Sequence, residues 1–415
     1  MEEVKVGRQV NRSIFGQARM AVAALVPLLL LGVVIALFVI TGAGLRVKPV
    51  APIEVLNIQP IILRPGEIVV PVLNSGPEAV TVAQVLVDDA IWMAEAKPSN
   101  VIPRLGQATF TIPYMWVGGE PLFVKLITSN GLVFEREVAV AAPSPVPSLD
   151  AFLRFGLVGI YVGVIPVGLG LLWFPFMRRL GRQAMNAILA LTVGLLVFLV
   201  VDTLLEALEV AGRVPGVFQG VPLVAFGMLL SFLLLIAIGQ TGRAGRGQGL
   251  SRLSLSYLIA LGIGLHNLGE GLAIGAAFAL GEAALGAFLV IGFTLHNITE
   301  GVGIAAPVAR EEPRLRHFVQ LAALAGGPAI LGTWLGGFVY SDIAAALFFG
   351  IGAGAILQVI YEVTRLIVRD SAKDNRPAFS WANLGSLTAG LVVMYVAAFR
   401  VKFLAWSPVQ AVDQR

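Results

Sequence analysis

Two six-residue strings, thirty residues apart, repeat one pattern within apolar sequence. In each string a histidine precedes a glutamate by four residues, so on a helix the two side chains lie on one face. An acidic side chain at the centre of a membrane helix costs about 3 kcal/mol, so two such pairs require a compensating partner. A divalent metal ion is the partner that suits both pairs. The strings are His266-Asn267-Leu268-Gly269-Glu270-Gly271 and His296-Asn297-Ile298-Thr299-Glu300-Gly301.

The strings offer two imidazole nitrogens and two carboxylates, from His266, Glu270, His296 and Glu300. This donor set suits Zn²⁺ in four-coordinate geometry, because two negative charges balance the ion. Fe²⁺ and Mn²⁺ also bind imidazole and carboxylate but prefer more ligands, which Asn267, Asn297 and water could supply. Thiolate and thioether ligands are absent from the strings, which argues against Cu⁺. Gly271 and Gly301, each directly after a glutamate, are expected to let the two ligand-bearing helices approach closely.

Two further apolar segments carry a polar pair at the same four-residue spacing, Asp202 with Glu206 and Gln358 with Glu362. Ionisable residues inside membrane spans nearly always face the bundle interior or a water-filled cavity. Four such faces turned together would line one polar pathway. Three other acids fall near the ends of apolar segments and are expected to be solvated: Glu209, Glu282 and Asp342.

The composition of the chain is that of a polytopic membrane protein. Of its 415 residues, 57% are hydrophobic and only 13% are charged, whereas soluble domains carry about 25% charge. Cysteine is absent, which excludes disulfides, thiolate metal sites and thiol nucleophiles. The formal net charge of +4 is divided among separate loops, so no nucleic-acid-binding patch is indicated.

The N-terminal third is predicted to contain an anchor and a β-domain. Residues 1–45 comprise a basic segment and an apolar span from Met20 to about Ile40, which is longer than the core of about 7–15 residues in a signal peptide and therefore favours a retained anchor. Residues 46–148 contain six or seven short β-rich runs separated by turn signals such as Ser129-Asn130-Gly131, a pattern typical of an immunoglobulin-like β-sandwich. The sandwich contains neither histidine nor cysteine, so we expect a structural or partner-binding module rather than a metal site.

Residues 149–415 are predicted to form an all-α domain of eight membrane spans. The spans are 152–177, 185–210, 220–239, 253–280, 284–308, 318–340, 343–367 and 382–404, each as long as the about 20 residues that a hydrocarbon core requires. Basic residues crowd every second loop, as at 178–182 and 365–376, and the positive-inside rule places these loops in the cytoplasm. The N-terminus is then cytoplasmic, the sandwich and the C-terminus are extracytoplasmic, and nine spans cross the cell membrane.

Residues 149–415 resemble the ZIP (Zrt-, Irt-like) family of divalent-metal transporters. The resemblance rests on the eight predicted spans, the cytoplasmic loop between the third and fourth, and the paired strings on the fourth and fifth. It implies that the histidine and glutamate of each string are the transport-site ligands, and that Asn267 and Asn297 fall where a second metal binds in some members. Asn297 and Gly327 stand where some members have a carboxylate, so a single-metal pathway is expected. Asp202 matches a family acid, while Glu206 replaces a frequent histidine.

The resemblance implies a transporter rather than an enzyme, which moves metal toward the cytoplasm by alternating access. Zn²⁺ is the expected substrate, with Fe²⁺, Mn²⁺ and Cd²⁺ as the other candidates. The resemblance also implies a homodimer in which the first, fourth, fifth and sixth spans slide against the rest. Two alternatives stay open: a membrane-embedded zinc metallohydrolase that uses the same residues around a bound water, and a metal sensor or scaffold. The sandwich could be a gate, a dimer contact or a dock for an extracytoplasmic partner.

Overall fold

The computed structural model describes residues 25–38, 40, 53–244, 251–281 and 283–409. The chain divides into two compact units, residues 1–53 and 54–415. Within the first unit, Leu25–Phe38 form an apolar helix whose large side chains are exposed, as expected for a helix that faces lipid. Residues 20–24 and 39 of the predicted anchor lie outside the described residues.

Residues 56–138 form two five-stranded antiparallel sheets that share one apolar core. Val70 in the first sheet lies opposite Phe110 in the neighbouring strand, and both side chains point into the core. Alternate residues of the longer strands do the same, because successive side chains point to opposite faces of a sheet. The first sheet contains β1 (Leu56–Ile58), β2 (Ile62–Arg64), β3 (Glu67–Asn74), β6 (Glu95–Lys97) and β8 (Gln107–Ile112). The second contains β4 (Val80–Val87), β5 (Ala90–Trp92), β7 (Val101–Ile102), β9 (Leu122–Thr128) and β10 (Val133–Val138).

This β-rich part contains more strands than the six or seven that the sequence predicts. The apolar run 53–63 is divided, because β1 ends at Ile58 and β2 begins at Ile62 on either side of Pro60. Proline has no backbone N–H and interrupts a strand ladder. The additional strands β5, β6 and β7 contain two or three residues each, too few for an alternating pattern to be detected.

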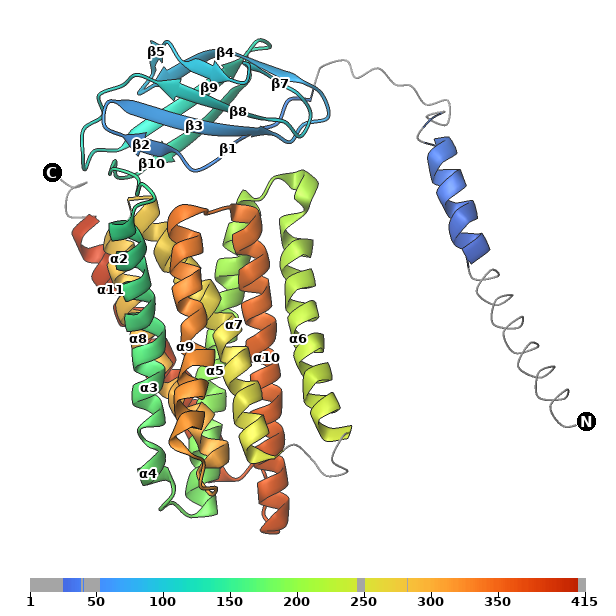
Figure 1. The fold of residues 1–415 in the computed structure, drawn as a ribbon, viewed down its shortest axis with the longest axis vertical. Helices are drawn as coiled ribbons and strands as arrows, with labels where there is room; N and C mark the ends of the chain where they lie inside the picture. Colours follow the sequence, from blue (N-terminus) through green and yellow to red (C-terminus); the bar gives the residue numbers. More distant parts are fainter. Residues whose placement is uncertain (1–24, 39, 41–52, 245–250, 282, 410–415) are drawn as a thin grey trace, which may run out of the picture. The chain divides into compact units, whose positions relative to one another are not determined.

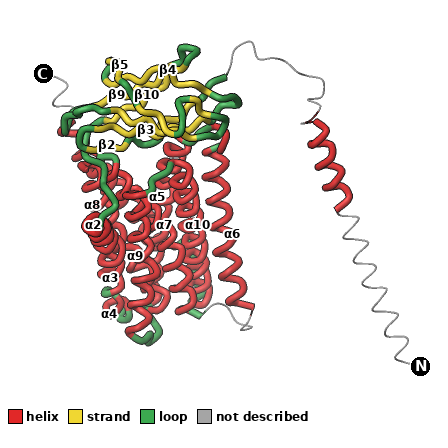
Figure 2. Tube along the Cα trace, turned by 45° about the horizontal axis from the view of Figure 1, so that its top comes forward, coloured by secondary structure: helices red, strands yellow, loops and turns green. Residues whose placement is uncertain are grey.

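Residues 149–409 form a bundle of helices that run side by side (Figure 1). Among the described residues, seven helical segments are long and apolar enough to cross a membrane, so the chain is a membrane protein. In the last helix the apolar stretch Trp381–Val396 is shorter, and an eighth span stays a prediction. The elements are α2 (Leu149–Gly159), η2 (Ile160–Val164), α3 (Ile165–Leu171), α4 (Phe174–Met177), α5 (Arg182–Arg213), η3 (Gly216–Phe218), α6 (Gly220–Ala244), α7 (Arg252–Ala279), α8 (Ala283–Ala305), η4 (Ala306–Val308), α9 (Leu315–Phe338), α10 (Asp342–Lys373) and α11 (Trp381–Val409). Figure 2 distinguishes these helices from the strands and loops by colour.

Hydrogen bonds between charged side chains place the basic loops at one end of this bundle. Arg178 Nη2 donates to Glu312 Oε1 at 2.9 Å, and Arg182 pairs with Asp374. Arg252 connects the start of α7 to η4 and to the last turns of α10. We call this end the basic-loop end. Its cytoplasmic location stays a prediction of the positive-inside rule.

Glycines let some helices pack backbone against backbone, and these contacts define a first group of elements. A β-carbon on Gly271 of α7 would collide with the carbonyl oxygen of Ala329 in α9. One on Gly301 of α8 would collide with the carbonyl oxygen of Val167 in α3. Gly163 of η2 is equally close to the α9 backbone. Because no flexible side chain lies between these backbones, the elements are fixed against one another. We call α2, η2, α3, α7, α8 and α9 the site group.

The expected role of Gly271 and Gly301 is therefore wrong. They do not bring the two ligand-bearing helices together, because each glycine joins its own helix to a different neighbour. Sequence spacing shows that a small residue lies on a helix face, but the partner of that face depends on the tertiary arrangement.

Backbone contacts of the same kind join α5, α6, α10 and α11, which we call the flanking group. A β-carbon on Gly354 of α10 would collide with the carbonyl oxygen of Met228 in α6. One on Gly390 of α11 would collide with the carbonyl oxygen of Leu191 in α5, and Gly220 brings the start of α6 against the end of α5.

Contacts between the site group and the flanking group are looser than the backbone contacts within each group. A β-carbon on Gly262 of α7 would meet the side chain of Val359 in α10, and one on Gly269 would lie 3.3 Å from the ring of Phe349. At Gly352 of α10 the nearest atom is the Cα of His266, at 3.3 Å, which is tight without a collision. Side chains can change rotamer, whereas a backbone carbonyl cannot yield. The boundary between the groups is thus less tightly packed, backbone against backbone, than the contacts within each group.

Candidate metal site

The two repeated strings form the middle turns of α7 and α8, and their donor atoms converge. One ligand atom each from His266, His296 and Glu300 lie within 4.8 Å of one another. Nε2 of His266 lies 3.0 Å from Oε1 of Glu270, and Nε2 of His296 is hydrogen-bonded to the same oxygen. All four side chains are buried, and His296, the most exposed, has an exposed fraction of 8%. Three of the four predicted donors thus form a group that could hold a metal ion, and the fourth, Glu270, is hydrogen-bonded to both histidines.

Local sequence explains how α7 presents its pair. The helix begins directly after Ser251, whose Oγ accepts a hydrogen bond from the amide of Ser254 at 3.1 Å and so caps the first turn. The helix ends at Ala279, and Gly281 follows with a φ of 80°, a conformation that glycine adopts without strain. Between these ends His266 and Glu270 are one turn apart, which is why their side chains meet.

Glu300 is the donor that the surrounding protein leaves unsatisfied. Both of its carboxyl oxygens are buried without a hydrogen-bond partner among the described residues, and its exposed fraction is 2%. Nδ1 of His266 is buried and unpartnered as well. Buried polar atoms are almost always hydrogen-bonded in folded proteins, because leaving them unpaired costs free energy. A cation held between these side chains would supply the missing partner.

Asn267 and Asn297 are held so that their carbonyl oxygens remain free. Nδ2 of Asn267 donates to the carbonyl of Ala325 in α9 at 3.0 Å. Nδ2 of Asn297 donates to the carbonyl of Val162 at 3.0 Å and to Oε2 of Glu270 at 3.2 Å. Both Oδ1 atoms are buried without a partner. Because the nitrogens are engaged, the amide oxygens are the atoms left to bind a cation. Val162 lies in the π-helical turn η2, an irregularity often found at functional sites.

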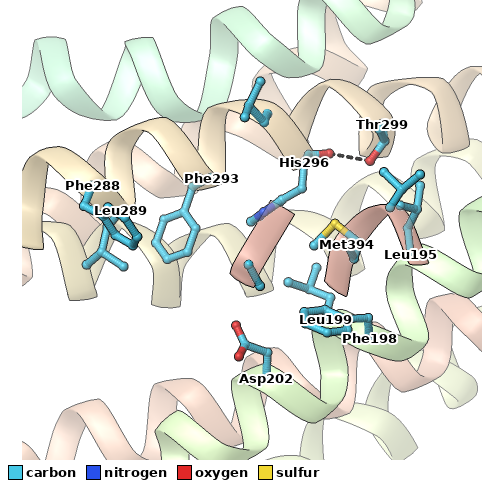
Figure 3. A pocket seen from close by; sticks show the side chains of 14 residues that line it. Leu195, Phe198, Leu199, Asp202, Phe288, Leu289, Phe293, His296, Thr299 and Met394 are labelled. Carbon is cyan, nitrogen blue, oxygen red and sulfur yellow. Dashed lines mark hydrogen bonds between the residues drawn. The ribbon is translucent and has the colours of Figure 1, made fainter. Parts of the chain in front are cut away.

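Two cavities lie between the donors and the end of the bundle opposite the basic loops. The larger has a volume of about 430 Å³ and is lined by Asp202 and Glu206, with Glu209 and Arg213 from the last turns of α5. The smaller has a volume of about 170 Å³ and is lined by Asp202 and His296. In Figure 3 these two side chains point into the smaller cavity from facing helices. Asp202 lines both cavities, whereas Glu206 lines only the larger one.

The predicted pair on α10 lines neither of the two cavities. Gln358 and Glu362 are buried, with exposed fractions of 0% and 3%. Both polar atoms of the Gln358 side chain lack a hydrogen-bond partner. Oε1 of Gln358 would lie 3.6 Å from a β-carbon on Gly262 of α7, one turn from His266 toward the basic-loop end.

The expectation for Asp342, near the end of the larger cavity, is wrong. Asp342 was expected to be solvated but has an exposed fraction of 5%, because Tyr340 covers it and donates a hydrogen bond to Oδ1 at 2.9 Å. Burial and the neighbouring Asp342 carboxylate raise the pKa of Tyr340 above its ordinary value. Tyr340 and Arg213 both line the cavity, and neither was singled out, because a lone polar residue at a span end has no sequence pattern. Glu209 is exposed as expected, and Glu282 lies outside the described residues.

Comparisons with known proteins add no relative. No protein-family model matches the chain, and no curated protein sequence matches it. The assignment of the converging side chains to metal binding therefore rests on their chemistry and geometry.

Proposed function

We propose that the chain transports divalent metal cations across a membrane, with Zn²⁺ as the best-matched substrate. The observation that carries the proposal is the buried convergence of two imidazoles and two carboxylates from α7 and α8, with both oxygens of Glu300 unpaired. Two carboxylates neutralise a divalent ion, and imidazole with carboxylate is a preferred donor set for zinc. Asn267 and Asn297 add oxygen donors for ions that favour more ligands, such as Fe²⁺ and Mn²⁺.

The positions of the cavities support passage of the ion rather than storage. The acid-lined cavity begins beside Glu209 and Arg213, in the last turn of α5, which is opposite the basic-loop end. On the other side of the donors, Ile259, Ile263 and Ile304 belong to a buried apolar core. The site is thus approached from one end and closed toward the other, as alternating access requires. If the basic loops are cytoplasmic, this conformation faces outward.

The division of the helices supports the same mechanism. The four donors and both asparagines lie on α7 and α8. Apart from Glu300, which is unpaired among the described residues, they hydrogen-bond to partners within the site group. Asp202 lies on α5, in the flanking group. A movement of one group along the other would carry the intact donor set past a stationary Asp202. We therefore assign to Asp202 and Glu206 the role of a cation route that leads to the site, and to Gln358 and Glu362 a role on the basic-loop side.

Zinc flux into liposomes that contain the purified full chain tests the proposal. We expect His296→Ala and Glu300→Ala to abolish flux because each removes a donor, whereas His317→Ala should leave it unchanged. His317 is a matched control, because its Nδ1 lies 2.8 Å from the hydroxyl of Tyr257, away from the donors. Asp202→Asn should reduce flux less than Glu300→Ala, since Asp202 borders the route and is not a donor.

The same assay separates the alternatives. Normal uptake by both donor variants would contradict the assigned site. Zinc binding without flux by the unmodified protein would instead favour a sensor, a scaffold or a metallohydrolase. Flux measured with Zn²⁺, Fe²⁺, Mn²⁺ and Cd²⁺ in parallel would identify the preferred ion.

A further inference from the structure

An ion pair at the basic-loop end crosses the boundary between the site group and the flanking group. Nη2 of Arg252, the first residue of α7, lies 3.2 Å from each carboxylate oxygen of Asp370 in α10. Nη1 of Arg252 also donates to the carbonyl of Pro307 in η4, at 3.4 Å. The two side chains are largely buried, with exposed fractions of 28% for Arg252 and 11% for Asp370. Arg252 thus ties the ends of α7 and α8 to the end of α10.

Two other ion pairs at the same end stay within one group. Arg178, which follows α4, pairs with Glu312 between η4 and α9, inside the part of the chain that contains the site group. Arg182 of α5 pairs with Asp374 directly after α10, inside the flanking group. These pairs can persist when one group moves along the other. The pair Arg252–Asp370 cannot, because a displacement of one helical turn is about 5.4 Å and exceeds its contact distance.

Each partner of this pair has its charge at the unfavourable end of its own helix. Arg252 begins α7, where the helix dipole presents positive charge, and Asp370 lies in the last turns of α10, where the dipole presents negative charge. Neither charge therefore stabilises the helix that carries it. Their mutual attraction across the boundary is the favourable interaction that remains.

We propose that Arg252 and Asp370 form a latch that holds the basic-loop end of the bundle closed while the acid-lined cavity is open. Breaking the pair lets the site group slide and exposes the apolar core between α7 and α10. The latch adds a state-dependent contact to the alternating access of the proposed function and depends on that function.

The absence of cysteine from the chain allows a direct test with single introduced cysteines in the full-length protein. Val363→Cys places a reporter in the closed apolar core, where Val363 has an exposed fraction of 0%. Ala273→Cys places a second reporter in the acid-lined cavity. A membrane-impermeant maleimide is applied from the basic-loop side to the first reporter and from the opposite side to the second. Labelling is measured without metal, so the result does not depend on whether the converging side chains bind zinc.

We expect Arg252→Gln and Asp370→Asn each to raise labelling of the Val363→Cys reporter by about fivefold, the population change that corresponds to about 1 kcal/mol. Labelling of the Ala273→Cys reporter should fall at the same time. The exchange Arg252→Asp with Asp370→Arg should return the Val363→Cys reporter to its original labelling or below, and the Ala273→Cys reporter to its original labelling or above. The reason is that the pair is restored with each charge at the favourable end of its helix. Arg178→Gln is the matched control and should change neither reporter.

Three results would overturn the latch: unchanged labelling in both single variants, failure of the charge exchange to restore the original pattern, or an equal change in Arg178→Gln. If one single variant does not fold, the other and the charge exchange still decide the question. Failure of the proposed function can be distinguished from failure of the latch. Zinc flux that survives in His296→Ala and Glu300→Ala would contradict the metal site, whereas the labelling experiment contains no metal and tests the latch alone.

Discussion

Glu300→Met separates the contribution of this carboxylate to cation binding from its effect on the fold. Both oxygens are buried without a hydrogen-bond partner, in a side chain with an exposed fraction of 2%. Leaving a buried acceptor unsatisfied costs about 1–3 kcal/mol. Methionine keeps an unbranched chain and removes both oxygens. We therefore expect the variant to increase the free energy of unfolding of the metal-free protein by at least about 1 kcal/mol.

Zinc should instead stabilise the unmodified protein more than the Glu300→Met variant. At a zinc concentration 100 times its Kd, the unmodified protein gains about 2.7 kcal/mol of stability from binding. Substitution of a residue that only supports a metal ligand lowers metal affinity by about 10–100-fold. We therefore take a loss of zinc affinity of about 100-fold when the ligand itself is removed. At the same zinc concentration the variant then gains about 0.4 kcal/mol. With a shift of about 2–4 °C per kcal/mol, the zinc-dependent rise in Tm falls from about 5–10 °C to about 1 °C.

Thermal unfolding of the two purified proteins in detergent, with and without zinc, measures both effects. Glu209→Met is the matched control, since Glu209 lies on the exposed end of α5 with its side chain 77% exposed, and it should change neither quantity. A Glu300→Met protein that is less stable than the original without metal would show that the carboxylate supports the fold. An undiminished rise in Tm with zinc would show that Glu300 does not bind the ion.

Three further predictions concern the packing, the histidines and the sandwich. Gly271→Ala should lower the free energy of unfolding by about 1–3 kcal/mol, because its methyl group collides with the carbonyl of Ala329. Gly327→Ala is the control and should not lower it, because no heavy atom lies within 4 Å of the added methyl group. Thermal unfolding of the two variants measures the difference. Zinc affinity should weaken as the pH falls from about 7.5 to 5.5, since imidazole binds metal when neutral and ordinarily has a pKa of about 6.5; equilibrium zinc binding that is flat over this interval would argue against histidine ligands. Phe110→Ala, at a core position with an exposed fraction of 2%, should destabilise the sandwich by about 3–5 kcal/mol in chemical unfolding while zinc binding is unchanged.

The sequence predicts those parts of the site that depend on a single helix. His266 and Glu270 lie one turn apart, and their direct contact of 3.0 Å follows from that spacing. The hydrogen bond between His296 and Glu270 joins two helices, and the apolar pattern of either helix contains no information about the rotation of the other. For the same reason the orientation of Asn267, fixed by the carbonyl of Ala325 on α9, could not be foreseen.

The fold shows a similar division between local and tertiary information. Long apolar helices and strands of six or more residues carry a periodic pattern, and seven of the nine predicted membrane helices and the main β-strands agree with the described part of the structure. The short strands β5 to β7 lack such a pattern. Asp342 was misassigned because its position near a span end indicates solvent, whereas Tyr340 from the preceding turn buries it.

The placement of the acids on two separate groups has a consequence for the affinity of the site during transport. His296 lines the same cavity as Asp202, which belongs to the flanking group, while Glu270 and Glu300 move with the histidines. On the proposed mechanism, the ion is therefore bound next to an additional carboxylate when the acid-lined cavity is open. Sliding of the site group removes that carboxylate from the neighbourhood, and the attraction between unit charges falls with distance and with hydration. The same four donors would then hold the ion more tightly where it is collected than where it is released.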